Sequence, residues 1–382
     1  MDFSLTEEQL AIQNMARQFA EDQIGPYALE WEDSGDLPVD VLREAAGLGM
    51  AGIYVAEDVG GSGLNRIDAA LIFEALAMGD PVVSSFLSIH NMCAWMIDEF
   101  GDDRLRTEWV PKLCTMELIA SYCLTEPGSG SDAAALKTRA VREGGEYVLN
   151  GSKSFISGGG VSDIYIVMCR TGDDSPRGIS AIIVPKDTPG LTFGAREKKM
   201  GWNAQPTTMV YFENARVPVA NLIGDEGTGF KFAMAGLDGG RINIAACSLG
   251  AAQAALDKAV AYMLERYTFG KLLAEFQALQ FKIADMETEL QAARIFLYQS
   301  AWKLTNKAPD ATKYCAMAKR LVTDIGFNVA NEALQLHGGY GYLTEYGIEK
   351  TVRDLRVHQI LEGTNEIMRV IIAKAMLGKN LV

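Results

Sequence analysis

The chain has 382 residues, of which 48% are hydrophobic and 22% charged, and its mean hydropathy is +0.04. This composition excludes a disordered chain, and at about 150 residues per domain the length predicts two or three folded units. Asp and Glu number 49 against 35 Lys and Arg, which gives a formal net charge of -14. Such an acidic chain repels phosphate backbones and anionic lipid headgroups, so we expect no nucleic-acid binding and no membrane binding.

The cysteine pattern indicates neither a metal site nor a disulfide framework. The six cysteines are scattered without a CxxC pair, and only His90, His337 and His358 could join them as ligands. The N-terminal stretch MDFSLTEEQL is acidic, and no apolar run reaches the ~18 residues of a membrane span. We therefore expect a cytoplasmic protein, or a mature chain from which a leader has been removed.

The first third of the chain is predicted to be helical. Thr6 and Gln9 form a capping-box pair, and the apolar stripe behind them has helical spacing as far as Gly25-Pro26. Leu37-Pro38 places a proline at the start of a second helix. Apolar-rich helices are predicted at residues 67–79 and 84–100. Residues 1–118 are therefore expected to form an N-terminal helical domain.

Short β-branched and aromatic runs follow, separated by Gly, Pro, Asp and Asn, as is typical of strands. They predict a small middle β domain at residues 119–226, with strands at 147–149, 164–167, 179–184 and 209–212. Long stretches without proline then predict helices at 240–267 and 272–307, a third that Pro309 opens and that ends at Leu336, and a last one at 365–377. The predicted fold class is α+β, with residues 227–382 forming a C-terminal antiparallel helical bundle.

Common signatures of nucleotide-binding and hydrolytic folds are missing from the sequence: there is no GxxxxGK[ST], GxGxxG after a strand, GxSxG or HExxH. What remains are Gly, Ser and Thr segments at the ends of predicted elements, where backbone N–H groups can face a phosphate. Each also has a purely structural interpretation: Gly338-Gly339 as a helix C-cap, Thr364 as an N-cap, and residues 128–132 as a turn.

Three motifs in one order along the chain resemble the acyl-CoA dehydrogenase family: YCLTEPGSGSD at residues 122–132, RYTFG at 266–270 and LEGTNE at 361–366. The resemblance covers essentially the whole chain. Within the family, residues 88–98, 239–245 and 358–363 are most similar to the branch that acts on isobutyryl-CoA. The resemblance implies a short branched-chain acyl-CoA as substrate, a step in valine catabolism, electron-transfer flavoprotein as acceptor and a homotetramer built as a dimer of dimers. For a processed chain, it implies the mitochondrial matrix.

The resemblance also implies FAD, held between the β domain and the bundle and completed by a neighbouring subunit. From the same subunit it assigns to the cofactor Tyr122, Leu124, Thr125, Gly130, Ser131, Phe155, Ile156, Ser157, Thr364, Asn365 and Glu366. From across the subunit boundary it assigns Arg266, Phe269, Phe276, Gln277, Gln335, Gly338 and Gly339. Arginine suits a pyrophosphate because its guanidinium can bind two oxygens, although a lone arginine on a long helix more often forms a surface ion pair.

Glu362 matches the family's catalytic base, which takes the α-proton of the acyl thioester while a hydride leaves the β-carbon. The apolar residues Ile360 and Leu361 before it predict a desolvated carboxylate with a raised pKa. The purely structural alternative is a glutamate that interacts with a helix N-terminus. For the CoA ester the resemblance assigns Ser131, Asp238, Gly239, Gly240, Arg241, Gly363 and Lys374. Close relatives carry arginine at the last position and more often asparagine at the position of Asp238.

Other functions remain open on the sequence alone. Butyryl-CoA or 2-methylbutyryl-CoA would suit a short acyl pocket, and an acyl-CoA oxidase or flavin monooxygenase of the same fold would pass electrons to oxygen. A helical scaffold that has lost its flavin is a non-enzymatic alternative, against which the presence of Glu362, Arg266 and the glycine-rich segments argues.

Overall fold

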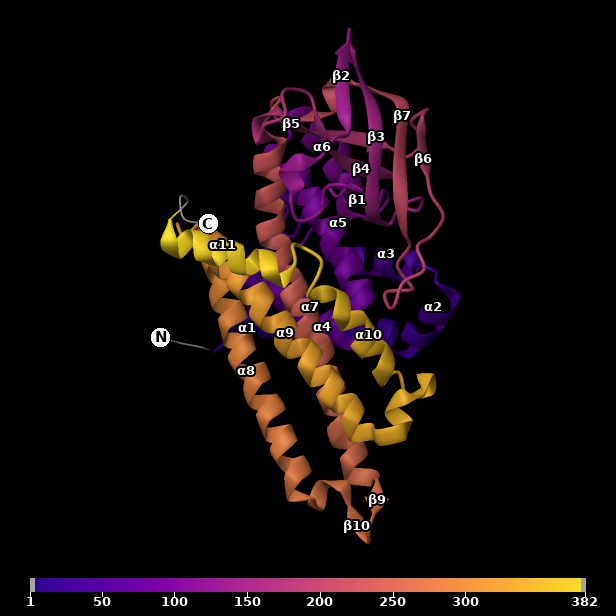
Figure 1. Cartoon of the computed structure of the whole chain (residues 1–382), viewed down its shortest axis with the longest axis vertical. Coiled ribbons are helices and arrows are strands. Elements are labelled where there is room, and N and C mark those ends of the chain that lie inside the picture. The colour runs from indigo at the N-terminus through magenta and orange to yellow at the C-terminus, as the bar shows by residue number, and fades with distance from the viewer. Residues whose placement is uncertain (1–3, 379–382) are drawn as a thin grey trace.

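The computed structural model describes residues 4–378, so the first three residues of the N-terminal stretch lie outside it. Figure 1 shows a β sheet at one end of an elongated molecule and three long C-terminal helices that reach the other end. The N-terminal helices pack behind the junction between them. The order of helices, sheet and helices confirms the predicted α+β class.

The N-terminal helices are α1 (Glu7–Phe19), α2 (Ala28–Ser34), α3 (Val39–Gly47), α4 (Arg66–Gly79), α5 (Pro81–Phe100) and α6 (Asp103–Cys114). The Thr6 capping box is present as predicted. The first helix, however, is α-helical only to Phe19 and continues as a π-helical turn to Ile24. The helix expected at Pro38 is the third of the chain, because α2 precedes it. Most residues of α4 and α5 are buried, since these two helices lie between the sheet and the bundle.

The sheet consists of β1 (Ala120–Cys123), β2 (Arg139–Glu143), β3 (Glu146–Ser157), β4 (Ile164–Arg170), β5 (Ile179–Pro185), β6 (Leu191–Phe193), β7 (Thr207–Pro218) and β8 (Leu222–Ile223). The strand order is β6-β7-β3-β2-β4-β5-β8, and β1 pairs in parallel with β4. All seven residues of β4 are buried, because one of its faces packs on the apolar side of α5 and the other on β3 and β7. The sheet is therefore fixed to the N-terminal helices, and β1 leads into the motif at residues 122–132.

The C-terminal helices are α7 (Gly229–Glu265), α8 (Gln277–Thr305), α9 (Ala311–His337), α10 (Ile348–His358) and α11 (Asn365–Leu377). The last of them has the predicted bounds. The helix expected at 240–267 starts 11 residues earlier, because a face containing Gly236, Gly239 and Gly240 packs closely on its neighbours and stays helical despite its glycines. The helix expected from Leu272 starts at Gln277, since residues 271–272 form a short hairpin strand with residues 267–268. Pro309 lies two residues before α9 and does not open it.

Helix α10 was not predicted, and its buried charges explain why. Lys350 and Asp354 occupy the positions where an amphipathic helix normally carries apolar side chains. Lys350 Nζ lies 2.7 Å from Asp354 and 3.0 Å from Asp80 at the start of α5. This buried ion triad replaces the apolar stripe on which sequence periodicity depends. It also joins α10 to the N-terminal helices, and α10 leads directly to the LEGTNE motif.

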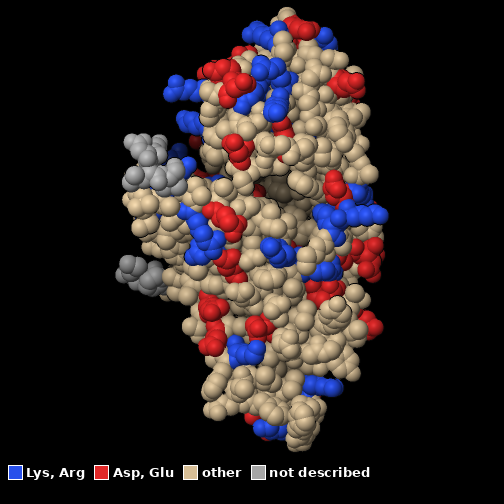
Figure 2. Space-filling model, in the orientation of Figure 1, with Lys and Arg blue, Asp and Glu red and all other residues tan. Residues whose placement is uncertain are grey.

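All six cysteines are buried and unpaired. Within residues 4–378 no group of three or more His, Cys, Asp or Glu side chains could hold a metal ion, and no helix is long and apolar enough to cross a membrane. On the face shown in Figure 2, acidic and basic side chains are interspersed, and the surface is hollowed where the sheet meets the bundle.

Candidate active site

Glu362 lies in a tight turn between α10 and α11. Its φ is 56° and that of Gly363 is 88°, so two successive residues adopt the left-handed conformation, which is unfavourable for a glutamate. Thr364 ends the turn as the N-cap of α11, because its Oγ1 accepts a hydrogen bond from the Ile367 amide at 3.3 Å. The N-cap interpretation of Thr364 is therefore correct. We call residues 361–364 the Glu362 turn.

The Glu362 carboxylate points inward onto α7. A Cβ atom added to Gly240 would lie 2.5 Å from Glu362 Oε2, so only glycine leaves room for the carboxylate at that position. Oε2 is buried and has no hydrogen-bond partner within the described part of the chain. Burial raises the pKa of Glu362 to about 7, although Arg241 and Lys319 both act to lower it. A desolvated carboxylate with one free oxygen is suited to accepting a proton near neutral pH.

Arg241 connects the Glu362 turn to the residues assigned to CoA. Its Nη1 lies 2.7 Å from Asp238 Oδ1, and its Nε donates to the backbone carbonyl of Glu362 at 3.3 Å. Thr312 Oγ1 donates to the other oxygen of Asp238 at 2.5 Å. Both carboxylate oxygens of Asp238 therefore have hydrogen-bond partners within the chain. The structure brings Asp238 together with Gly239, Gly240, Arg241 and Gly363.

Tyr122 reaches the same centre from β1. Its hydroxyl is buried without a hydrogen-bond partner among the described residues. Burial raises its pKa well above the usual value, and the nearby negative charge of Glu362 adds to that effect. A neutral phenol with an unused donor therefore lies beside the carboxylate.

The motif after Tyr122 is held by a buried ion pair. Lys153 Nζ lies 2.7 Å from Glu126 Oε1, and it also donates to the Leu124 carbonyl at 3.0 Å. The Thr125 carbonyl accepts from the Ser154 amide at 2.8 Å, which places residues 124–131 beside residues 155–157. Gly130 and Ser131 are exposed, and Ile156 and Ser157 are buried or half-buried. Phe155 is 69% exposed and has a φ of 58°, so an aromatic ring stands out from a strained position next to this loop.

A second group of predicted residues lies far from Glu362, at the lower end of the bundle (Figure 1). Here a cavity of about 580 Å³ is lined by Arg266, Gln335, Gly338 and Gly339, among others. Arg266 forms no ion pair in the region that the structure describes, and its guanidinium lies 5.3 Å from the centre of the Tyr340 ring. The surface ion pair that would have been the ordinary interpretation of this arginine is therefore not observed.

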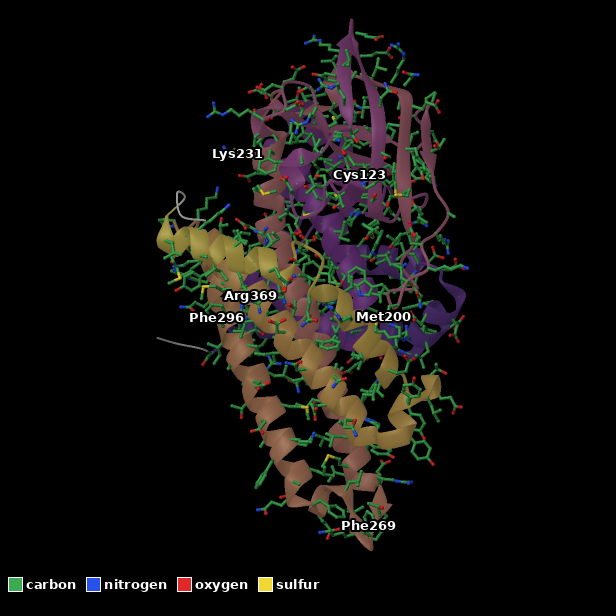
Figure 3. The ribbon with its side chains drawn as sticks, viewed as in Figure 1. Cys123, Met200, Lys231, Phe269, Phe296 and Arg369 are labelled. Atoms are coloured by element: carbon green, nitrogen blue, oxygen red, sulfur yellow. The ribbon has the colours of Figure 1, made fainter. Side chains whose placement is uncertain are left out.

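Phe269, Phe276 and Gln277 lie beside that cavity. Phe269 is 92% exposed, and its ring meets Phe276 edge-on at 6.5 Å. Nothing lies within 4 Å of a Cβ added to Gly338 or Gly339, so this backbone is open to a ligand. We call residues 266–277 and 335–339 the bundle tip. Figure 3 shows Phe269 at one end of the molecule and Cys123 in the sheet, so one chain does not bring the two groups of predicted cofactor residues together.

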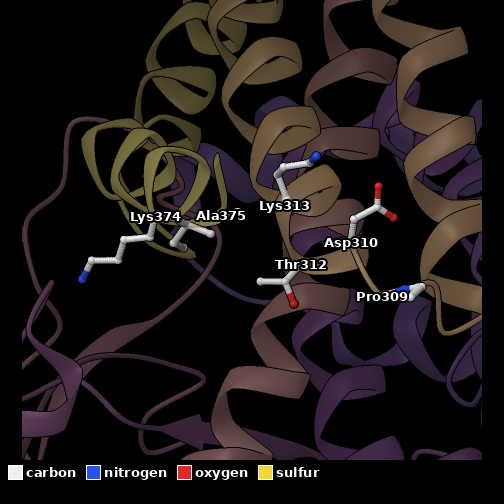
Figure 4. Close-up of a pocket in the computed structure, with 7 residues that line it drawn as sticks. Pro309, Asp310, Thr312, Lys313, Lys374 and Ala375 are labelled. Carbon is white, nitrogen blue, oxygen red and sulfur yellow. The ribbon is translucent and has the colours of Figure 1, made fainter. Parts of the chain in front are cut away.

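The remaining predicted residues lie on α11. Asn365 is buried and hydrogen-bonded to Thr323, Asp324 and Lys319, so its side chain serves the protein interior, whereas Glu366 is exposed. Lys374 lines a cavity of about 560 Å³ with Asp310, Thr312 and Lys313. In Figure 4 the Lys374 side chain extends away from Asp310. Because Thr312 also binds Asp238, this cavity adjoins the Asp238–Arg241 pair.

The sequence analysis missed several residues at this centre. Lys319 is fully buried on α9 and contacts the Glu362 turn, and Cys93 on α5 is buried with its pKa raised partly by Glu362. Arg66 on α4 is almost buried, stacks 3.6 Å from the centre of the Tyr54 ring and packs on Gly239. A signal existed for Lys319 alone: it falls on the stripe of buried positions formed by Cys315, Val322 and Gly326.

Both groups have features that suit a flavin dinucleotide. Among residues 4–378, the Tyr122 hydroxyl is a buried polar atom without a partner and Arg266 has no acidic partner. The Phe155 ring is exposed, and the open glycine backbone of the bundle tip lies beside Arg266. A flat ring system and a pyrophosphate call for these groups. The residues present therefore fit the cofactor.

Comparisons with known proteins agree with this geometry. Three family models match the chain: acyl-CoA dehydrogenase N-terminal domain at residues 6–117, middle domain at 121–215 and C-terminal domain at 227–377. The chain is 56% identical over 373 residues to a protein named isobutyryl-CoA dehydrogenase, mitochondrial, of Bos taurus, which covers 98% of this chain and 90% of that one.

Among solved structures, butyryl-CoA dehydrogenase from Megasphaera elsdenii has a TM-score of 0.95 and 39% identity, over 99% of this chain and 100% of that chain. A chain from work on the electron transferring flavoprotein of Acidaminococcus fermentans has a TM-score of 0.96 and 39% identity, with the same coverage. The family is FAD-dependent, which confirms the predicted cofactor. The chain belongs to the acyl-CoA dehydrogenase family and is an FAD-dependent oxidoreductase.

Proposed function

We propose that the protein dehydrogenates a short α-branched acyl-CoA, converting isobutyryl-CoA to methacrylyl-CoA as in valine catabolism. The observation that carries the chemistry is the buried Glu362 carboxylate, with one free oxygen and a pKa raised to about 7. The observation that favours this substrate is the 56% identity to the bovine protein named for it. The relatives named as mitochondrial support the mitochondrial matrix as compartment.

Glu362 acts as the base in this proposal. Its free oxygen takes the proton from the α-carbon, and the electron pair of that C–H bond forms the new double bond as a hydride leaves the β-carbon. FAD, when bound, supplies the acceptor for that hydride. Because the carboxylate is desolvated, it is a stronger base than an exposed glutamate, and with a pKa of about 7 roughly half of it is ionised at pH 7.

The Glu362 turn can also stabilise the thioester oxygen as negative charge develops on it. The Glu362 backbone N–H donates no hydrogen bond to any residue that the structure describes. Its left-handed conformation is fixed by the contacts of the turn, so the N–H need not reorganise during the reaction. On the CoA side we assign Arg241, positioned by Asp238, together with Ser131 and Lys374.

The flavin would be held by residues 122–131, 155–157 and 364–366 of one subunit and by the bundle tip of another. The distance between the two groups within one chain supports a site shared by two subunits. The homotetramer built as a dimer of dimers is assigned from the family resemblance. We assign electron-transfer flavoprotein as acceptor, which the solved structure from work on such a flavoprotein supports.

A panel of acyl-CoA esters tests the substrate. We expect kcat/KM with one electron acceptor to be highest for isobutyryl-CoA, lower for 2-methylbutyryl-CoA and butyryl-CoA, and lowest for octanoyl-CoA. One methylene in an apolar pocket changes specificity by roughly 10-fold to 200-fold, so we expect preference rather than exclusivity. A higher value for octanoyl-CoA would overturn the branched-chain assignment. Fast peroxide release in air would instead indicate an acyl-CoA oxidase.

A further inference from the structure

The Glu362 turn requires an external support because its backbone is strained. Glu362 is a non-glycine residue at a φ of 56°, so its conformation stores energy that the surrounding contacts must offset, whereas Gly363 adopts its positive φ freely. Few of those contacts come from the turn itself. The strongest come from α9, which packs along both α7 and α11.

Lys319 on α9 supplies these contacts. Its Nζ donates to the Gly363 carbonyl at 2.9 Å and to Asn365 Oδ1 at 2.8 Å, on either side of the N-cap Thr364. The lysine is 0% exposed, and no carboxylate lies within ion-pair distance of it among residues 4–378. An ammonium group is costly to bury without an acidic partner, so a lysine placed here calls for an explanation beyond packing.

The other cation near Glu362 differs from Lys319 in this respect. Arg241 forms an ion pair with Asp238 at 2.7 Å, although of the two cations it lowers the pKa of Glu362 more. Lys319 is left as the positive charge without a counterion. The ionisable groups that face the pair are Arg241 on α7, Asp324 on α9, Glu366 on α11, His358 on α10, Tyr122 on β1 and Cys93 on α5.

We propose that Lys319 is the positioning residue for Glu362: its two hydrogen bonds hold the strained turn, and its uncompensated charge favours the ionised carboxylate. This inference rests on the proposed role of Glu362 as base. Burial lowers the pKa of Lys319 to about 7, while the charge of Glu362 acts in the opposite direction. Each of the two charges therefore favours the charged form of the other group.

Two neutral replacements separate the hydrogen bonds from the charge. Lys319→Gln keeps a donor for the turn, and Lys319→Met keeps the bulk but neither donor nor charge. With FAD-loaded enzyme, the rate of flavin reduction at saturating isobutyryl-CoA is followed in the absence of air from pH 5.5 to 9. Without the cation the pKa of Glu362 rises by about one unit, so the acidic midpoint of the profile should move up by that amount in both variants.

At pH 7 this shift lowers the rate roughly fivefold, and the difference should shrink towards pH 9 for Lys319→Gln. For Lys319→Met the plateau should fall as well, because the turn has lost its support. Lys319→Arg should restore the midpoint. Thr323→Val is the matched control, since it removes a hydrogen-bond partner of Asn365 but leaves the cation, and its midpoint should match the unmodified enzyme.

An unchanged midpoint in Lys319→Gln and Lys319→Met would overturn the proposal. A midpoint that moves equally in Thr323→Val would also overturn it, because the shift would then come from disturbed packing around Asn365. Glu362→Gln distinguishes an error in the proposed base from an error in the proposed role of Lys319. If that variant reduces flavin normally, the assignment of the base is wrong, whereas an inactive Glu362→Gln with unchanged Lys319 profiles refutes the role of Lys319 alone.

Discussion

The Glu362 turn and the bundle tip differ in how complete they are within one chain. At the turn, the residues proposed for the proton transfer come from the same subunit: a buried carboxylate, a glycine that makes room for it and cations from α7 and α9. At the bundle tip, Phe269 is almost fully exposed, Arg266 has no acidic partner within the described residues and the glycine backbone is open. The buried carboxylate of the turn therefore suits proton transfer, whereas the exposed groups of the bundle tip suit the binding of a ligand or of another subunit.

This contrast predicts that damage to the two regions has different consequences. Changes at the turn should reduce the rate of the chemical step and leave cofactor content unchanged. Changes at the tip should reduce cofactor content and assembly, and leave the chemistry of each remaining flavin unchanged.

Glu362→Gln should have the largest effect. Glutamine keeps the shape of the side chain but cannot accept the proton, and removal of a general base lowers the rate by ~10² or more. Flavin reduction by isobutyryl-CoA, measured without air, gives the rate, and the visible spectrum gives the FAD content. A near-normal rate would show that another group is the base, and loss of FAD would show that the turn also holds the cofactor.

Arg266→Ala should weaken FAD binding by roughly 10-fold to 100-fold, because a hydrogen bond to a charged group contributes about 1.5–3 kcal/mol. The dissociation constant for FAD and the mass of the assembly in solution check this. The rate per bound flavin should stay within about twofold of the unmodified enzyme. A monomer that retains full FAD occupancy would contradict an FAD site shared between two subunits.

Gly240→Ala should misplace the base without removing it. The added methyl group would lie 2.5 Å from Glu362 Oε2, and displacement of a reacting group by about 1 Å can cost up to 10²-fold. We expect flavin reduction to slow by roughly 10-fold. Gly236→Ala, one turn earlier on α7, is the matched control: its methyl group would meet the flexible side chain of Met96 at 3.2 Å, so the rate should change much less. Equal effects of the two substitutions would indicate a general response of the helix.

Sequence analysis predicts the order of helices and sheet and the position of α11, because apolar periodicity and caps are local properties. It fails at α10, where buried Lys350 and Asp354 replace the apolar stripe, and at the start of α7, where glycines are held in a helix by tertiary packing. The motifs predict which residues form the site, and that assignment stays a prediction. They do not show that Lys319 supports the Glu362 turn, because that contact joins residues 44 positions apart.

The smallest expected effect is on stability, and it follows from the same raised pKa. The pKa of Glu362 is about 7 in the folded protein against an ordinary value of 4.5, so between pH 4.5 and 7 the folded state binds more protons than the unfolded state. Stability is therefore lost as the pH rises through that window, and the full cost is present above pH 7. Glu362→Gln removes this cost. At pH 8 its free energy of unfolding should therefore be higher than that of the unmodified enzyme by on the order of 1–3 kcal/mol, and its unfolding temperature should be higher as well. The gain should shrink towards pH 5.

Thermal unfolding at equal FAD occupancy measures this gain in stability. Glu366→Gln is the control, since Glu366 is exposed at the start of α11 and its replacement should give no gain. Equal unfolding temperatures for Glu362→Gln and the unmodified enzyme at pH 8 would mean that the carboxylate is not destabilised in the folded state, and the contrast between a desolvated carboxylate at the turn and an open tip would be wrong.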